Sequence, residues 1–147
     1  MNFLDEIREL QENKTNEVLA VRKEILEYFR NYLEDDKFKE YLKKRMLYAI
    51  NKLEKTIALN ISFWEYRSGC SQTNIKCCGK IFELSNCDTS YKGINLKAIH
   101  KEICKRLSNM VVLQLEELEL KVVRQERHDY ESRFDDYNED IIITWNY

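Results

Sequence analysis

The sequence predicts an α+β fold in which residues 1–147 form one domain. Apolar residues recur every three or four positions through residues 1–56, which is typical of amphipathic helices. From Leu59 they alternate with polar residues, and a β-branched and aromatic run closes the chain, which favours strands. We therefore expect a helical part at 1–56, and at 57–147 a small antiparallel sheet, built from a central hairpin and a C-terminal strand, with one long helix.

The helical part is expected to hold three helices. Asn2 can cap a short first helix, and the polar run at residues 12–16 is predicted to end it. Thr15 or Asn16 would then cap a second helix, and Asp35 or Asp36 a third helix at 37–56. The predicted buried side of the third helix consists of Phe38, Tyr41, Leu42, Met46, Ala49, Ile50 and Leu53.

The sheet is expected from three segments. Alternation from Leu59 to Tyr66 predicts a strand, and a second strand at 76–84, interrupted by Gly79, would pair with it as an antiparallel hairpin. The loop between them would span residues 67–75. The closing segment 141–147 should add a third strand that is buried on both faces.

Residues 95–130 are predicted to form the long helix. Its main apolar stripe starts at Leu96, and a second apolar set lies off this stripe: Val112, Leu113, Leu120 and Val123. A helix with two apolar sides needs two partners, and the second is either another part of this chain or a second copy of it. We expect a homo-oligomer with these four residues at the interface. The alternative is that residues 111–123 form a strand; Leu, Gln, Glu and Lys favour the helix.

Charge is segregated along the chain although the net charge is −2. Residues 1–36 have 5 basic and 10 acidic side chains, residues 37–106 have 15 and 6, and residues 107–147 have 4 and 10, so the balances are −5, +9 and −6. No segment is as long and apolar as a membrane span, and the first residues lack the features of a secretory signal. We expect no membrane association and a location in a cytoplasm or a host cytoplasm.

Cysteines are the candidate metal ligands. Cys70, Cys77, Cys78 and Cys87 are close in sequence, but neighbours on a strand point to opposite faces, so Cys77 and Cys78 could share one zinc ion only in a turn. We expect free thiols, no metal and no cofactor. Cys104 lies one helical turn from His100, and we expect a core cysteine beside a surface histidine. His128 lacks the second histidine of a zinc-protease motif.

Two candidate anion sites lie in the basic segment, residues 37–106. The loop before the long helix could present backbone N–H groups and side chains to a phosphate, through Thr89, Ser90, Lys92, Lys97 and Arg67. The loop matches no nucleotide-binding fingerprint. The helix at 37–56 has Lys43, Lys44 and Arg45 as a basic surface for nucleic acid, although a pI near 5.8 argues against that ligand.

These observations favour a small, non-enzymatic interaction protein that binds a protein partner. The chain lacks proline and is rich in Lys, Asn, Ile and Tyr, as AT-rich coding produces. A phage or mobile-element inhibitor of a host defence or nucleic-acid-handling complex fits this composition. Its acidic flanks, 1–36 and 124–140, would occupy a basic channel. The alternatives are a nucleotide binder that uses the Lys92 loop, and a nucleic-acid binder that uses helix 37–56.

Overall fold

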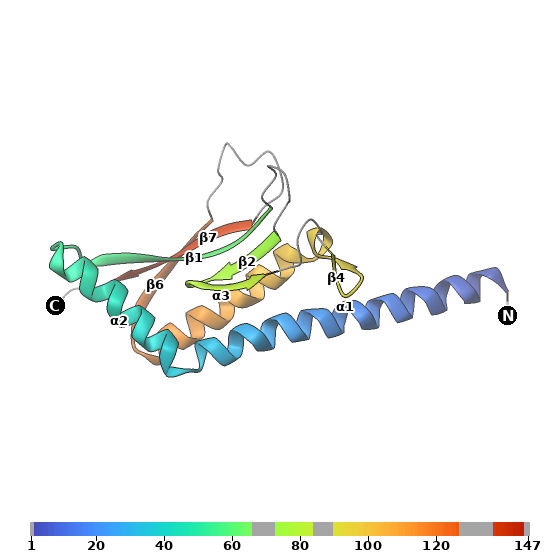
Figure 1. Cartoon of the computed structure of the whole chain (residues 1–147), viewed down its shortest axis with the longest axis horizontal. Helices are drawn as coiled ribbons and strands as arrows, with labels where there is room; N and C mark the ends of the chain where they lie inside the picture. The colour runs from blue at the N-terminus through green and yellow to red at the C-terminus, as the bar shows by residue number, and fades with distance from the viewer. Residues whose placement is uncertain (1, 66–72, 84–89, 127–136, 146–147) are drawn as a thin grey trace.

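The computed structural model describes residues 2–65, 73–83, 90–126 and 137–145. Within these ranges the chain forms three α-helices, a five-stranded sheet and a separate two-stranded sheet (Figure 1). Strands of the larger sheet lie in the order β3-β2-β1-β7-β6, and each neighbouring pair is antiparallel. The predicted α+β fold is confirmed.

Helix α1 runs without interruption from Phe3 to Leu33, so the predicted break at 12–16 is wrong. Asn2 caps the helix as expected, since its side chain accepts a hydrogen bond from the Asp5 N–H at 2.9 Å. The polar run contains neither proline nor glycine, and the Thr15 hydroxyl donates to the Gln11 carbonyl at 2.9 Å within the helix. At about 1.5 Å per residue, α1 is about 46 Å long.

Helix α2 spans Asp36–Asn51, and the Asp35 carboxylate caps it by accepting from the Lys37 N–H at 2.9 Å. The predicted end at residue 56 is too late. Leu53 adopts φ +62°, and the Glu54 N–H bonds back to the Ala49 carbonyl at 2.8 Å. This is the Schellman pattern, which ends a helix through one left-handed residue.

Strand β1 (Thr56–Glu65) pairs with β2 (Thr73–Cys77), which confirms the predicted hairpin. The predicted single strand at 76–84 is instead divided into β2 and β3 (Lys80–Glu83). Cys78 and Gly79 both have positive φ, +50° and +84°, and form the two-residue turn between them. Such turns match the twist of the flanking strands.

The C-terminal strand β7 (Tyr137–Thr144) starts earlier than predicted and lies at the centre of the sheet, between β1 and β6. Ile141 and Ile143 are fully buried on one face, and Ile142 is half-buried on the other. Burial is therefore complete on one face and partial on the other.

The predicted long helix is correct only for residues 100–117; it is wrong at residues 95–99 and from Leu118 to Glu126, and residues 127–130 lie outside the described residues. The segment begins with strands β4 (Ser90–Tyr91) and β5 (Ile94–Asn95) and a short 3-10 helix, Leu96–Ala98. Helix α3 covers His100–Glu117 and ends in a second Schellman pattern: Glu119 has φ +61°, and the Leu120 N–H bonds to the Leu115 carbonyl at 3.1 Å. Residues Lys121–Glu126 then form edge strand β6, so the alternative of a strand over residues 111–123 is right only for residues 121–123 and wrong for residues 111–117, which belong to α3.

The helices pack on one face of the larger sheet, where the core lies (Figure 1). Alternate residues of β1, Leu59, Ile61 and Phe63, point into this core. The helices contribute Val21, Ile25, Phe29 and Leu33 from α1, Phe38, Leu42 and Ala49 from α2, and Ile103, Leu107, Val111 and Leu115 from α3.

Candidate interaction surfaces

Lys92, the central residue of the predicted anion site, has a partner within the chain. Lys92 lies in the turn between β4 and β5, and its ammonium forms an ion pair with Glu24 of α1 at 2.9 Å. The Tyr91 hydroxyl donates to the same carboxylate at 2.6 Å. These bonds from Tyr91 and Lys92 lower the pKa of Glu24, and the bond to Glu24 raises the pKa of Lys92. The positive charge of Lys92 is therefore already balanced by a partner within the chain.

Two of the other predicted anion ligands, Ser90 and Lys97, fall within the described residues. Lys97 is exposed on the 3-10 helix, where its backbone N–H donates to the Asn95 side chain at 3.0 Å. Ser90 is half-buried in β4. Thr89 and Arg67 lie outside the described residues. The predicted phosphate loop is thus a hairpin turn followed by a helix start that Asn95 caps.

Only two of the three residues of the predicted basic surface on α2 are exposed. Lys43 and Lys44 are exposed, but Arg45 turns toward the sheet. Its guanidinium donates to the Tyr41 hydroxyl at 2.9 Å and to the Ala58 carbonyl at 2.8 Å. Arg45 therefore joins α2 to β1, and the two lysines keep the exposed positive charge.

Cysteines contribute to the core. Cys77, Cys78 and Cys104 are buried free thiols, and the described residues contain no group of three potential ligands around a metal position. Burial raises the pKa of Cys104, which keeps its thiol protonated. The prediction of a surface histidine beside it is wrong, because His100 is buried and stacks on Phe63 with ring centroids 4.2 Å apart. Cys70, Cys87 and His128 lie outside the described residues.

The predicted oligomer interface is distributed over three elements. Val112 is half-buried on α3 and Leu120 half-buried after it, whereas Leu113 on α3 and Val123 on β6 are 60% and 65% exposed. The argument from a helix with two apolar sides no longer applies, because Val123 belongs to a strand. Self-association needs a different physical basis.

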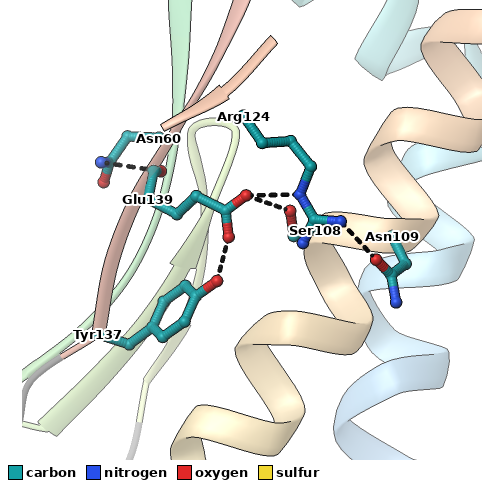
Figure 2. A network of polar contacts seen from close by, with 6 residues as sticks. All are labelled: Asn60, Ser108, Asn109, Arg124, Tyr137 and Glu139. Atoms are coloured by element: carbon teal, nitrogen blue, oxygen red, sulfur yellow. Dashed lines mark hydrogen bonds and ion pairs between the residues drawn. The ribbon is translucent and has the colours of Figure 1, made fainter. Parts of the chain in front are cut away.

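A buried carboxylate that sequence reasoning missed joins α3, β6 and β7 (Figure 2). The side chain of Glu139 is 2% exposed, and one of its oxygens accepts from Ser108 and from the Arg124 guanidinium, each at 2.7 Å. Its second oxygen accepts from the Tyr137 hydroxyl. Burial acts to raise the pKa of Glu139, but these bonds outweigh it and the pKa is lowered. Both oxygens are engaged, so the network stabilises the packing of α3 on the sheet.

The N-terminal part of α1 extends beyond the sheet (Figure 1). We call residues 3–13 the arm. The arm exposes four large apolar side chains: Phe3 at 73%, Leu4 and Leu10 at 63%, and Ile7 at 36%. Phe3, Ile7 and Leu10 continue, through position 14, the same helix face that buries Val21 and Ile25 further along. The Lys14 ammonium donates to the Gly93 carbonyl at 3.0 Å and marks where the body of the molecule ends.

A second exposed apolar surface lies at the C-terminal end of α2. We call Leu47, Tyr48, Ile50 and Leu53 the α2 end. Ile50 and Leu53 were predicted to be buried, but they are 50% and 92% exposed. They border a hollow that Met46, Glu54, Lys55 and Trp145 also line. A left-handed leucine costs roughly 1–2 kcal/mol relative to glycine, so Leu53 combines backbone strain with an exposed apolar side chain.

Comparison with protein-family models, curated proteins and solved structures finds no match to this chain. Among the described residues, the helices are too short or too polar to cross a lipid bilayer. Function must therefore be argued from the surfaces themselves.

Proposed function

We propose that this protein is a small, non-enzymatic interaction protein that binds another protein through the arm. The observation that carries the proposal is the exposure of Phe3, Leu4, Ile7 and Leu10 on one face of a helix that extends beyond the core. Apolar side chains spaced three or four residues apart on a helix are the usual anchors for insertion into a partner's groove, and Phe3, Ile7 and Leu10 have this spacing.

The chemistry of the arm indicates the kind of partner. Besides its apolar face, residues 3–13 carry Asp5, Glu6, Glu9 and Glu12 against the single basic residue Arg8, a balance of −3. A complementary partner surface would be an apolar groove with basic residues at its rim. A basic nucleic-acid channel with apolar walls has these features, so the proposal includes a phage or mobile-element inhibitor that occupies such a channel in a host complex.

The nucleotide-binding alternative has less support. Its central residue, Lys92, is ion-paired with Glu24, and a bound phosphate would have to compete with that carboxylate. Two of its other residues, Arg67 and Thr89, lie outside the described residues. We therefore keep the arm as the proposed site.

Affinity capture with the full chain tests the proposal. Wild-type protein and a Leu4→Asp, Ile7→Asp, Leu10→Asp variant would be immobilised in parallel and exposed to an extract of the cells that express the chain. We expect proteins that the wild type retains to be lost with the variant. For one such partner, purified, the affinity should fall about 100-fold or more, because each buried apolar side chain contributes about 1.5–3 kcal/mol.

A matched control separates the apolar face from added charge. Asn13→Asp and Asn16→Asp add negative charge to α1 at two exposed positions away from the four apolar residues. This variant should keep the partner, and thermal unfolding of both variants should match the wild type because all five substituted positions are exposed on α1. Retention of every partner by the triple variant would refute binding through the arm.

A further inference from the structure

We infer that the α2 end of a second copy of this chain is a docking site for the arm, so that the protein self-associates by arm exchange. This inference rests on the proposed function, because it names one partner for the same arm. The first support is shape and polarity. The α2 end offers exposed Leu47, Ile50 and Leu53 beside a hollow, and the arm offers exposed Leu4, Ile7 and Leu10 on a helix face.

Charge favours this pairing over contact between two arms. Residues 43–55 contain Lys43, Lys44, Arg45, Lys52 and Lys55 against Glu54, a balance of +4, and these four lysines are exposed. Lys43 and Lys44 lie one helical turn before Leu47 and Tyr48. The arm has a balance of −3, so two arms would repel each other, whereas an arm and an α2 end attract.

The geometry requires two molecules. The arm and the α2 end lie at opposite ends of the long axis of the protein, and α1 is an uninterrupted helix between them (Figure 1). The arm therefore cannot fold back onto the α2 end of its own chain. Each copy presents one of each surface, so arm exchange between two copies makes the contact twice, and open-ended exchange makes longer assemblies.

The conformation of Leu53 supports a binding role for the α2 end. Its φ of +62° lies in the region where glycine or asparagine is favoured, and its side chain is 92% exposed. Within the folded chain this side chain gains little from burial. Docking of an apolar helix into the adjacent hollow would cover it together with Ile50.

Complementation between two variants tests the inference. The arm variant is Leu4→Asp, Ile7→Asp, Leu10→Asp, and the α2-end variant is Leu47→Asp, Leu53→Asp. Molar mass in solution should exceed the 17.8 kDa of one chain for the wild type and equal it for each variant alone. An equimolar mixture of the two variants should give a dimer, because one intact arm and one intact α2 end remain. Other self-association surfaces do not predict this rescue.

A control variant uses exposed apolar residues elsewhere. Leu113→Asp, Val123→Asp removes two comparably exposed side chains from α3 and β6, and it should assemble like the wild type. A monomeric wild type, an oligomeric α2-end variant, dissociation of the control, or failure of the mixture to dimerise would each overturn the inference. If the wild type is monomeric but still captures an external partner through the arm, this inference fails and the proposed function stands.

Discussion

At the scale of single residues, the buried carboxylate of Glu139 links α3 to the sheet through hydrogen bonds. Its carboxylate lies between α3 and the sheet and accepts hydrogen bonds from Ser108, Arg124 and Tyr137 (Figure 2). The pKa of Tyr137 is raised, first by burial and then by its bond to this carboxylate. The ionised form of Glu139 and the neutral form of Tyr137 therefore stabilise each other.

The Glu139→Gln substitution should lower the free energy of unfolding by about 1–3 kcal/mol at pH 7, because a neutral amide replaces a buried charged acceptor. The folded-state pKa of Glu139 lies below its ordinary value of 4.5. Its stabilisation is thus present above pH 4.5 and is lost as the pH falls through the lower folded-state value. Denaturant titrations at several pH values should show the difference between wild type and variant shrinking in acid.

Asn109→Ala provides the control for this network. Asn109 is exposed and accepts from Arg124 at 2.7 Å at the rim of the network. Its loss should change the free energy of unfolding by about 0.5 kcal/mol or less. A difference between wild type and Glu139→Gln that stays the same from neutral to acid pH would contradict the assigned role of the carboxylate.

Two glycines in tight turns allow the stability cost of backbone strain to be measured separately from the cost of a steric clash. Gly79 and Gly93 have similar φ values, +84° and +79°, but a Cβ at Gly79 would lie 2.8 Å from the Tyr41 ring, whereas nothing lies within 4 Å at Gly93. Gly93→Ala should cost about 1 kcal/mol from the backbone alone. Gly79→Ala should cost about 1–3 kcal/mol more, because Tyr41 is held by Arg45. If thermal unfolding shows that both substitutions lower the stability equally, the Tyr41 ring moves away from the new Cβ at position 79 without cost.

At the scale of elements, the end of α3 decides what residues 111–126 become. The helix continues through Glu117, and the left-handed Glu119 then directs the chain into β6 along β7. Two of the four residues that predicted a second apolar side on the helix therefore lie after the helix ends: Leu120 directly follows Glu119, and Val123 is in β6. Leu113 stays on α3 and is exposed, so it serves, together with Val123, as the control for self-association.

Replacement of Glu119 by glycine should stabilise the protein by about 0.5–1 kcal/mol, because glycine adopts φ +61° without steric cost. Glu117→Gly is the matched comparison. Glu117 is also exposed but lies in the last turn of α3, so glycine there should cost about 1 kcal/mol. Chemical denaturation of the two variants should give changes of opposite sign. Destabilisation by both would show that the helix end does not depend on a left-handed residue at 119.

At the scale of the whole molecule, α1 connects the core to the arm, one of the two surfaces proposed to bind. Its C-terminal part packs Val21, Ile25, Phe29 and Leu33 into the core, and its N-terminal part holds the arm away from it. Because α1 is one continuous helix, the arm is already helical before it binds, which reduces the entropy lost on binding.

By itself, the sequence determined the α+β fold class, the cap at Asn2, a cap at Asp35 or Asp36, the β1–β2 hairpin and the C-terminal strand. These features depend on local periodicity, side-chain capping and β-branched residues, all of which a short window contains. Only the tertiary structure decided that α1 is continuous, that Glu119 ends α3, that Lys92 pairs with Glu24, and that Phe3, Leu10 and Leu53 remain exposed. The pairing of Lys92 and the exposure of the apolar side chains depend on which distant segments meet, and the end of α3 depends on a left-handed residue other than glycine; neither leaves a local pattern. The continuity of α1 was missed because a polar run without proline or glycine is compatible with either a helix or a break.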